Sequence, residues 1–144
     1  MTGPDFDPVV VRAVYPPPRR IAIIGLSDRI GRPSHDVAGA LLRWGYEVVP
    51  INPGRDTILH QTCYPDLAHV PGPVDIVDVF RRSEHLEDHA EDILAKMPVV
   101  LWLQDGVRDD RLAARARALG ILVVQDDCIG RRVGGWRRPS AATH

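Results

Sequence analysis

The sequence predicts an open, doubly wound α/β protein, in which helices cover both faces of a mostly parallel, five-stranded sheet. Short apolar runs alternate with amphipathic stretches of about 10 to 12 residues, which is the pattern of strands joined by helical crossovers. The 144 residues, 44% of them hydrophobic, suffice for a single core that needs no disulfides. Small and polar residues also collect after the apolar runs, at one rim of the predicted sheet.

The first half of the predicted domain contains two strands and the helix that joins them. Residues 21–24 form a continuous apolar run, as expected of a strand that is buried on both faces. Apolar residues at helical spacing follow over residues 34–44. We expect Ser34 to be the N-cap of this helix and Gly45 to end it in the left-handed conformation. The second predicted strand covers residues 46–51.

The second half repeats the alternation of strands and helices. Residues 74–80 are the third predicted strand, and the apolar positions of residues 86–97 lie on one face of a helix. Residues 99–103 are the fourth strand. A helix over residues 109–120, with an aspartate as its cap and a glycine as its stop, leads to the fifth strand at residues 121–124.

Three segments are expected along the chain. Residues 1–19 are rich in proline and predict a lead-in, with a short helical turn in its middle. Residues 20–130 form the domain itself. Residues 131–144 contain four arginines and no acidic residue, which predicts a basic, flexible tail. Because the net charge of the chain is −1, the residues before this tail carry −5, and this argues against a domain that binds nucleic acid.

The cellular location is predicted to be the cytoplasm. The longest apolar stretch, residues 97–103, is far shorter than the roughly 20 residues that a membrane span requires. The chain does not open with a charged and then apolar leader. Its two cysteines, Cys63 and Cys128, cannot build a disulfide framework.

A phosphate site is expected after the first strand, since ligands of open α/β sheets bind outside the carboxyl ends of the strands. Gly25 lets the chain turn there without a side chain in the way of a ligand, and Ser27 offers a hydroxyl. The helix that follows directs its free amides and the positive end of its dipole to the same place, an effect of about 0.3–1 kcal/mol.

The surrounding residues indicate which phosphate ligand to expect. The loop over residues 25–31 does not have the GxGxxG pattern of NAD sites. The second strand ends in Asn52 and Pro53, with no carboxylate for the ribose hydroxyls. Arg55 follows instead, and this cation suits an extra phosphate on the ribose. Both NADP and coenzyme A (CoA) have such a phosphate.

Eight short motifs occur in a consistent order between residues 20 and 130. Together they resemble those of the small stand-alone CoA-binding proteins, which are similar to the N-terminal CoA-binding domain of the succinyl-CoA synthetase α subunit. The motifs are GLS at 25–27, RPS at 32–34, GY at 45–46, VPINP at 49–53, YPDL at 64–67, VDIVDVFR at 74–81, WLQDG at 102–106 and DC at 127–128.

The resemblance implies a Rossmann-like fold that binds CoA, and it assigns roles to particular residues. The sequence departs from the family pattern at two places: residues 60–63, before the YPDL motif, lack the usual glycine, and the basic ending is unlike that of the family. The implied site residues are Gly25, Ser27, Asp28, Arg29 and Ile30 for the diphosphate, Asn52, Pro53, Arg55, Phe80 and Arg81 for the adenosine and its 3′-phosphate, and Gln104 for the pantetheine arm.

The sequence offers no nucleophile paired with a base, so the expected function is the binding of CoA or acyl-CoA without catalysis by this chain alone. The alternatives are an NADP-dependent oxidoreductase, an accessory component of an acyl-CoA ligase or transferase, or a regulatory module that docks through its basic tail. The expected partners are a small-molecule ligand and either a second copy or an acyl-CoA enzyme, with no nucleic acid and no membrane.

Three further side chains have two interpretations each. His85 and His89 have the spacing of metal ligands on a helix, but a third ligand is not evident, so we expect an exposed polar face and no metal site. Cys128 lies just past the fifth strand. It could meet the CoA thiol or form a mixed disulfide with it, and the simpler expectation is a small residue that faces the core.

Overall fold

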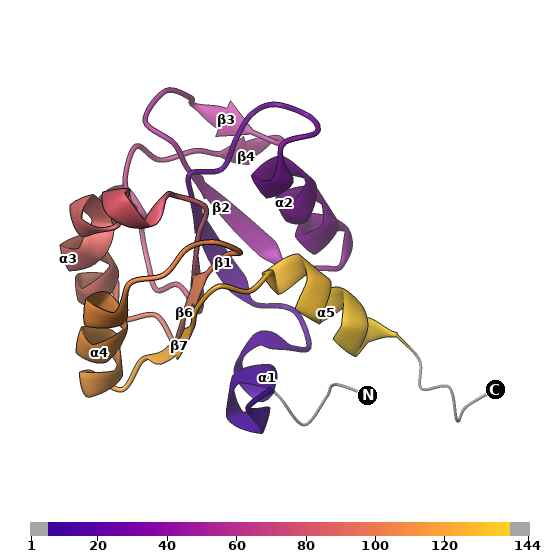
Figure 1. Cartoon of the computed structure of the whole chain (residues 1–144). Helices are drawn as coiled ribbons and strands as arrows, with labels where there is room; N and C mark the ends of the chain where they lie inside the picture. The colour runs from indigo at the N-terminus through magenta and orange to yellow at the C-terminus, as the bar shows by residue number, and fades with distance from the viewer. Residues whose placement is uncertain (1–5, 139–144) are drawn as a thin grey trace.

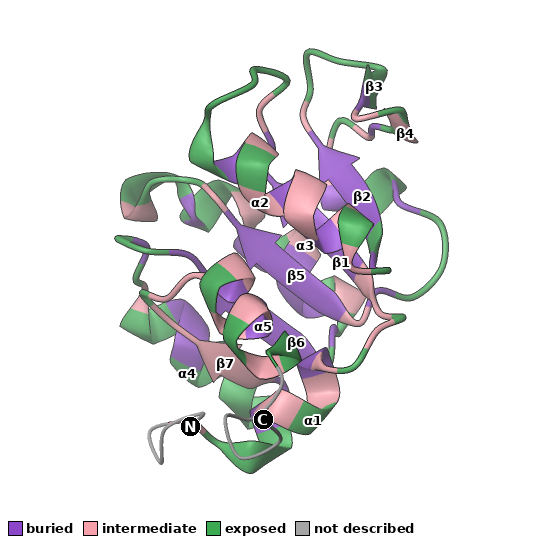
Figure 2. Cartoon of the chain, turned by 90° about the vertical axis from the view of Figure 1, so that its right-hand side faces the viewer, coloured by how far each residue is buried: buried purple, intermediate pink, exposed green. Residues whose placement is uncertain are grey.

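A five-stranded parallel sheet forms the centre of the structure, which is a computed structural model that describes residues 6–138 (Figure 1). Its strand order is β2-β1-β5-β6-β7, and each neighbouring pair is parallel, as predicted. The buried strands at its centre and the half-buried β7 at its outer edge are visible in Figure 2. The strands are β1 Arg20–Ile24, β2 Glu47–Ile51, β5 Ile76–Val79, β6 Val100–Leu103 and β7 Leu122–Val124.

Helices cover both faces of this sheet, so the prediction of a doubly wound architecture is confirmed. On one face, α3 and α4 pack against one cluster of buried residues. On the other face, α1, α2 and α5 pack against a second cluster (Figure 1). The helices are α1 Pro8–Val14, α2 Pro33–Arg43, α3 Glu87–Lys96, α4 Asp110–Ala118 and α5 Ile129–Arg137.

The order of the strands creates a crevice at the carboxyl edge. From β1 the chain passes through α2 to β2 on one side. It then returns through a small hairpin, β3 Thr57–Ile58 and β4 Gln61–Thr62, and a short 3₁₀ helix, η1 Leu67–His69, to β5 on the other side of β1. The connections that leave β1 and β5 therefore diverge, and such a switch point is where ligands bind in folds of this kind.

The predicted ends of the helices are confirmed in part. Gly45 and Gly120 have the expected left-handed φ values of 98° and 87°. The Asp109 side chain caps α4 by accepting a hydrogen bond from the N–H of Leu112 at 3.0 Å.

The prediction that Ser34 is the N-cap of α2 is wrong. Pro33 occupies the first turn of the helix and the N-cap is Arg32. A proline favours this position because its ring fixes φ, and it keeps the preceding residue extended. The Ser34 hydroxyl instead accepts a hydrogen bond from the N–H of Ser27 at 2.9 Å.

The basic segment differs from the flexible tail that was expected from residue 131. It is helical as far as Arg137, and Val133 is fully buried. Trp136 packs against Phe6 with ring centroids 5.4 Å apart. Ile129, Val133 and Trp136 form an apolar stripe at helical spacing, which the arginines around them obscure in the sequence. The part of the predicted tail over residues 139–144 lies outside the described residues.

The expected lead-in likewise contributes to the core. Its short helical turn is the helix α1, which an aspartate caps: Asp7 accepts a hydrogen bond from the N–H of Val9 at 2.9 Å. Val10 and Val14 of this helix are buried in the same cluster as α2 and α5. The packed unit therefore extends on both sides of residues 20–130.

Candidate functional site

Two cavities lie at the carboxyl edge of the sheet, and Arg81 lines both of them. The first has a volume of about 330 Å³ and opens beside the ends of β1 and β2. The second, of about 400 Å³, lies beside the ends of β5 and β6 and the first turns of α2 and α5. Because Arg81 follows the end of β5, its side chain lies at the switch point of the sheet.

Gly25 makes the close approach of the ends of β1 and β5 possible. Its φ is +82°, and a Cβ at this position would lie 2.7 Å from the carbonyl oxygen of Phe80 and 2.8 Å from Cδ of Arg81. Only glycine adopts this conformation without strain and leaves the space that these atoms occupy. Gly25 therefore has a steric role at the switch point, and it lines the first cavity.

The loop between β1 and α2 is held by its own side chains. The N–H of Arg29 donates to the Ser27 hydroxyl at 3.0 Å, and the N–H of Gly31 donates to Asp36 at 3.3 Å. Together with the bond from Ser27 to Ser34, these contacts fix the loop before a ligand arrives. The loop amides of Ser27, Arg29 and Gly31 are therefore already engaged.

The start of α2 keeps free donors. Its N-cap, Arg32, makes no capping hydrogen bond through its side chain. Within residues 6–138, the N–H groups of Ser34 and His35 have no hydrogen-bond partner. Unpaired amides in the first turn of a helix attract anions, and the helix dipole adds to the effect. An anion at this position is therefore favoured by α2 itself.

Arg55 and Asp28 form an ion pair across the mouth of the first cavity. The hydrogen bond with Arg55 lowers the pKa of the Asp28 carboxyl. Both side chains are exposed, at 54% and 37%, so solvent weakens their attraction and an incoming phosphate can compete for Arg55. Arg55 itself does not line the cavity, because the pair holds it at the rim.

Asn52 has a scaffolding role. Its side-chain amide donates to the carbonyl oxygen of Leu26 at 3.0 Å, and its side-chain oxygen accepts from the N–H of Gly54 at 2.8 Å. The two contacts tie the end of β2 to the end of β1 and shape the turn that presents Arg55. Asn52 thus lines the first cavity with a side chain that is already engaged.

His89 is a cavity residue that the sequence analysis placed on an exposed face. It lies on α3, is half-buried and lines the first cavity, whereas His85 is exposed. Burial lowers the pKa of the His89 imidazole, and the nearby charge of Arg81 acts in the same direction. In the sequence, only one feature indicates that His89 is partly buried: it directly precedes Ala90, which belongs to the buried side of α3.

Gln104 and Cys128 both line the second cavity. Cys128 is half-buried there, so the simpler expectation that it faces the core is wrong. Gln104 is only 3% exposed, and its side-chain oxygen accepts the first N–H of α5, that of Ile129, at 3.1 Å. Val37, Phe80 and Val107 form the apolar part of the cavity wall. Asp105 also lines this cavity, and it pairs with Arg131, which does not line it, at 3.0 Å.

The structure thus brings together most of the predicted site residues. Three of them lie outside both cavities, and one of these, Ile30, is 90% exposed. Gly25, Ser27, Asp28, Asn52 and Pro53 line the first cavity, Phe80 and Gln104 the second, and Arg81 both, whereas Arg29, Ile30 and Arg55 line neither.

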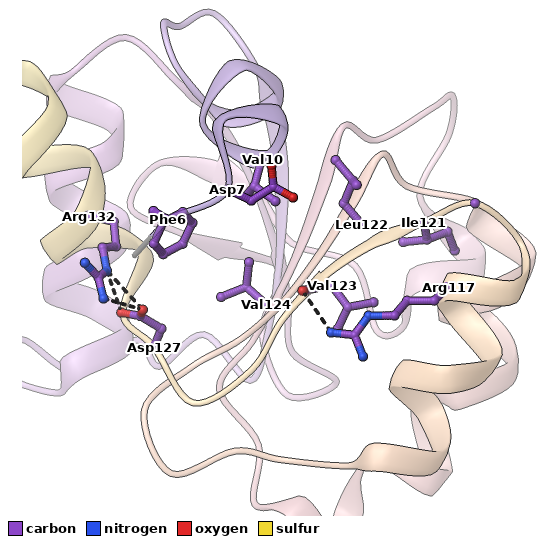
Figure 3. Close-up of a pocket in the computed structure, with 11 residues that line it drawn as sticks. Phe6, Asp7, Val10, Arg117, Ile121, Leu122, Val123, Val124, Asp127 and Arg132 are labelled. Atoms are coloured by element: carbon purple, nitrogen blue, oxygen red, sulfur yellow. Dashed lines mark hydrogen bonds and ion pairs between the residues drawn. The ribbon is translucent and has the colours of Figure 1, made fainter. Parts of the chain in front are cut away.

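A third and larger cavity, of about 570 Å³, runs along the outer edge of β7 (Figure 3). Phe6 lies on one side of it and Arg117 on the other. Both of its arginines are engaged with the protein: Arg117 with the carbonyl oxygen of Val123, and Arg132 with the carboxylate of Asp127. Because this groove flanks the sheet and its two arginines are already engaged, we place the candidate site in the first two cavities.

Within residues 6–138, no group of three histidine, cysteine or acidic side chains is arranged to hold a metal ion. None of the described helices has both the length and the apolar character that a bilayer span needs.

Comparison with known proteins identifies the family. A family model described as a CoA binding domain matches residues 19–133. The chain belongs to this CoA-binding domain family. The resemblance drawn from the sequence motifs is therefore confirmed.

Relatives of this CoA-binding domain include both small proteins and parts of large enzymes. It is 41% identical over 111 residues to the uncharacterized protein YneT of Bacillus subtilis, an alignment that covers 77% of this chain and 82% of YneT. It is also 34% identical over 61 residues to an ADP-forming acetate–CoA ligase of Archaeoglobus fulgidus. That match covers 41% of this chain and only 9% of the ligase.

Solved structures show the same fold. A protein of Thermus thermophilus described as cell-free ID.343 superposes with a TM-score of 0.84 at 32% identity, covering 90% of this chain and 98% of the other. A hypothetical protein from Pyrococcus horikoshii has a TM-score of 0.83 at 25% identity, covering 91% of this chain and 92% of the other. These are small proteins of nearly the same extent as this CoA-binding domain.

Proposed function

We propose that this CoA-binding domain binds coenzyme A, or an acyl-CoA, at the carboxyl ends of its parallel strands. The adenosine end would occupy the first cavity, and the pantetheine arm would run past Arg81 into the second. The observation that carries the proposal is that the two cavities share Arg81 at the switch point of the sheet. A nucleotide with a long arm needs two such adjoining spaces.

The diphosphate would lie between the cavities, against the start of α2. The unpaired N–H groups of Ser34 and His35 and the dipole of α2 supply favourable contacts for its charge. Arg81 can add a cation from the opposite side. The loop around Ser27 contributes rigidity, since its internal hydrogen bonds mean that little conformational entropy is lost on binding.

The 3′-phosphate would be recognised by Arg55. Its exposed ion pair with Asp28 keeps the guanidinium at the rim of the first cavity, where a phosphate of the ligand can replace the carboxylate as its partner. The guanidinium can donate two parallel hydrogen bonds to a phosphate, and such charge-assisted bonds are strong. Arg55 is thus the residue that separates CoA from dephospho-CoA.

The pantetheine arm would lie in the second cavity, where Val37, Phe80 and Val107 supply apolar contacts. Nothing in the two cavities pairs a nucleophile with a base within hydrogen-bond distance among the described residues. The chain's own residues therefore bind and orient the ligand. The ligase activity of the larger relative belongs to a protein of which the matching segment covers 9%.

Location and protein partners remain predictions. The described cysteines, Cys63 and Cys128, are both free, which is typical of a protein in a reducing compartment such as the cytoplasm. An acyl-CoA enzyme or a second copy of the chain is the expected protein partner, in line with the relationship to an acyl-CoA ligase.

A thermal-shift titration with CoA, dephospho-CoA, NADP and NAD tests the proposal. A ligand at 100 times its Kd stabilises the folded state by about 2.7 kcal/mol. For a chain of this size, that corresponds to a rise in Tm of roughly 5–11 °C. We expect CoA to give the largest rise and dephospho-CoA a smaller one. If NADP raised Tm more than CoA did, the proposed ligand would be wrong and an NADP-dependent role would replace it.

A further inference from the structure

The second cavity contains a free thiol that the proposed binding mode does not use. Cys128 is half-buried, lines the cavity and stands at the N-cap of α5. Its sulfur has no hydrogen-bond partner within residues 6–138. The starts of two helices converge here, because a Cβ on Gly130 of α5 would lie 3.3 Å from Val37 of α2. The thiol is therefore part of a formed wall of the cavity.

The neighbouring Gln104 supplies an independent sign that a ligand group belongs in this cavity. Its side chain is 97% buried, and the N–H of Ile129 donates to its oxygen at 3.1 Å. Since that contact needs an acceptor, the orientation of the amide is fixed and its nitrogen points the other way. This nitrogen has no hydrogen-bond partner within residues 6–138, so it is left as a donor toward the cavity. The nitrogen is open to the cavity, where the carbonyl oxygen of an amide or thioester would accept its hydrogen bond.

Positively charged and dipolar groups lie beside Cys128. The first turn of α5 directs unpaired amides and the positive end of its dipole at the N-cap residue. The guanidinium of Arg131, one turn along α5, adds a positive charge near Cys128. The acidic neighbour Asp127 is offset by ion pairs with Arg131 at 3.1 Å and Arg132 at 2.9 Å.

The other cysteine has the opposite surroundings. Cys63 is buried, and its thiol donates to the carbonyl oxygen of Asn52 at 3.4 Å. Burial raises the pKa of the Cys63 thiol, which disfavours the thiolate. Cys63 lines neither of the two cavities, so it serves as an internal control.

We propose that Cys128 is a thiol–disulfide exchange site for CoA, at which the protein takes up CoA from a CoA-containing disulfide as a mixed disulfide. The inference rests on the proposed CoA site, which would deliver the sulfur of the ligand to Cys128. Gln104 acts as a positioning residue, by donating a hydrogen bond to a carbonyl oxygen of the pantetheine arm. The domain would then hold CoA reversibly when CoA thiols are oxidised and release it when they are reduced.

The exchange step balances without any further oxidant when the reagent is CoA disulfide. The Cys128 thiolate attacks one sulfur of CoA disulfide, a new S–S bond forms between the protein and CoA, and the S–S bond of the reagent breaks. The electron pair of the broken bond leaves with the second CoA as its thiolate, which takes a proton from solvent. The sulfur of Cys128 is oxidised, and the sulfur that leaves is reduced. A small thiol reverses the step by the same chemistry.

The experiment measures the rate of adduct formation by intact-mass spectrometry, with CoA disulfide or glutathione disulfide as the reagent at equal concentration. The variants are Cys128→Ser, the matched control Cys63→Ser, and Gln104→Glu, which keeps the acceptor for Ile129 but removes the donor. We expect one CoA adduct on the wild-type protein and on Cys63→Ser, none on Cys128→Ser, and reversal by a reductant. Binding should make CoA disulfide react at least about tenfold faster than glutathione disulfide, because it holds the two sulfurs together.

Gln104→Glu tests the positioning role separately. It should reduce the rate ratio between the two reagents, whereas a purely structural role would change both rates alike. Equal rates with both reagents on the wild-type protein, or an adduct on Cys63, would overturn the inference. So would a failure to form the CoA adduct in a protein whose Tm still rises with CoA under reducing conditions, a result that leaves the proposed function intact. If CoA does not raise Tm under reducing conditions, the proposed function itself fails.

Discussion

Replacing Gly25 by alanine tests whether the ends of β1 and β5 must touch to form the site. The added Cβ would lie 2.7 Å from the carbonyl oxygen of Phe80 and 2.8 Å from Cδ of Arg81. The Arg81 side chain can move, but the carbonyl oxygen of Phe80 is part of the backbone at the end of β5 and can move only if the chain moves there. The substitution therefore strains the backbone at the switch point and displaces the side chain that lines both cavities.

The expected loss of stability has two parts. A left-handed φ of +82° costs a residue with a Cβ about 1–2 kcal/mol. The overpacking against Phe80 adds about 1–3 kcal/mol. Gly25→Ala should therefore lower the free energy of unfolding by about 2–5 kcal/mol, a large share of the 5–15 kcal/mol typical of a domain.

The matched control is Gly120→Ala. Gly120 has a similar φ of +87°, but a Cβ there would meet no atom within 4 Å. This variant should show the conformational cost alone, and any effect of alanine on the unfolded chain is common to both variants. Urea unfolding of both proteins gives the difference between their free energies of unfolding, provided that the slope of this free energy against urea concentration is the same in both. Equal losses of stability in the two variants, together with an unchanged CoA response in Gly25→Ala, would refute the reasoning.

Three further predictions concern single side chains. Arg55→Ala should weaken CoA binding about tenfold or more, as expected when a charge-assisted hydrogen bond is lost, and leave dephospho-CoA nearly unchanged in calorimetric titrations. Val133→Ala should lower the free energy of unfolding by about 1–3 kcal/mol in urea, because α5 belongs to the core and not to a flexible tail. Asp78 on β5 is fully buried and has no hydrogen-bond partner among the residues that the structure describes, and burial raises the pKa of its carboxyl well above the ordinary value. The folded state therefore keeps a proton that the unfolded chain loses above about pH 4, so this residue makes stability fall as pH rises from there toward the raised pKa. Asp78→Val should remove that part of the slope and be more stable at neutral pH by about 1–3 kcal/mol, and a variant with an unchanged pH profile would contradict the argument.

The parallel sheet could be predicted because its strands are buried on both faces. Such strands appear in the sequence as continuous apolar runs, as at residues 21–24, and need no long-range information. The helix α5 could not be predicted in the same way. Its arginines dominate the composition, while its burial depends on Trp136 reaching Phe6, a contact between segments far apart in the sequence.

The candidate site could be predicted only as far as the ends of the strands. The rule that ligands bind at the carboxyl edge placed Gly25, Phe80 and Gln104 beside a cavity, and the structure agrees. It could not place His89, because the rotation of α3 on the sheet decides which side chain of that helix enters the first cavity. It also could not reveal that Arg55 is paired with Asp28, since that contact joins two loops that only the folded sheet brings together.

The indole of Trp102 has a consequence for experiments. Its N–H donates to the carbonyl oxygen of Asp127 at 2.8 Å, the residue directly before Cys128, and its ring stacks on Phe6. Any movement of the chain at Cys128 thus changes the polarity around a buried fluorophore. Tryptophan emission should therefore follow occupancy of the second cavity in real time, without a label and in the unmodified protein.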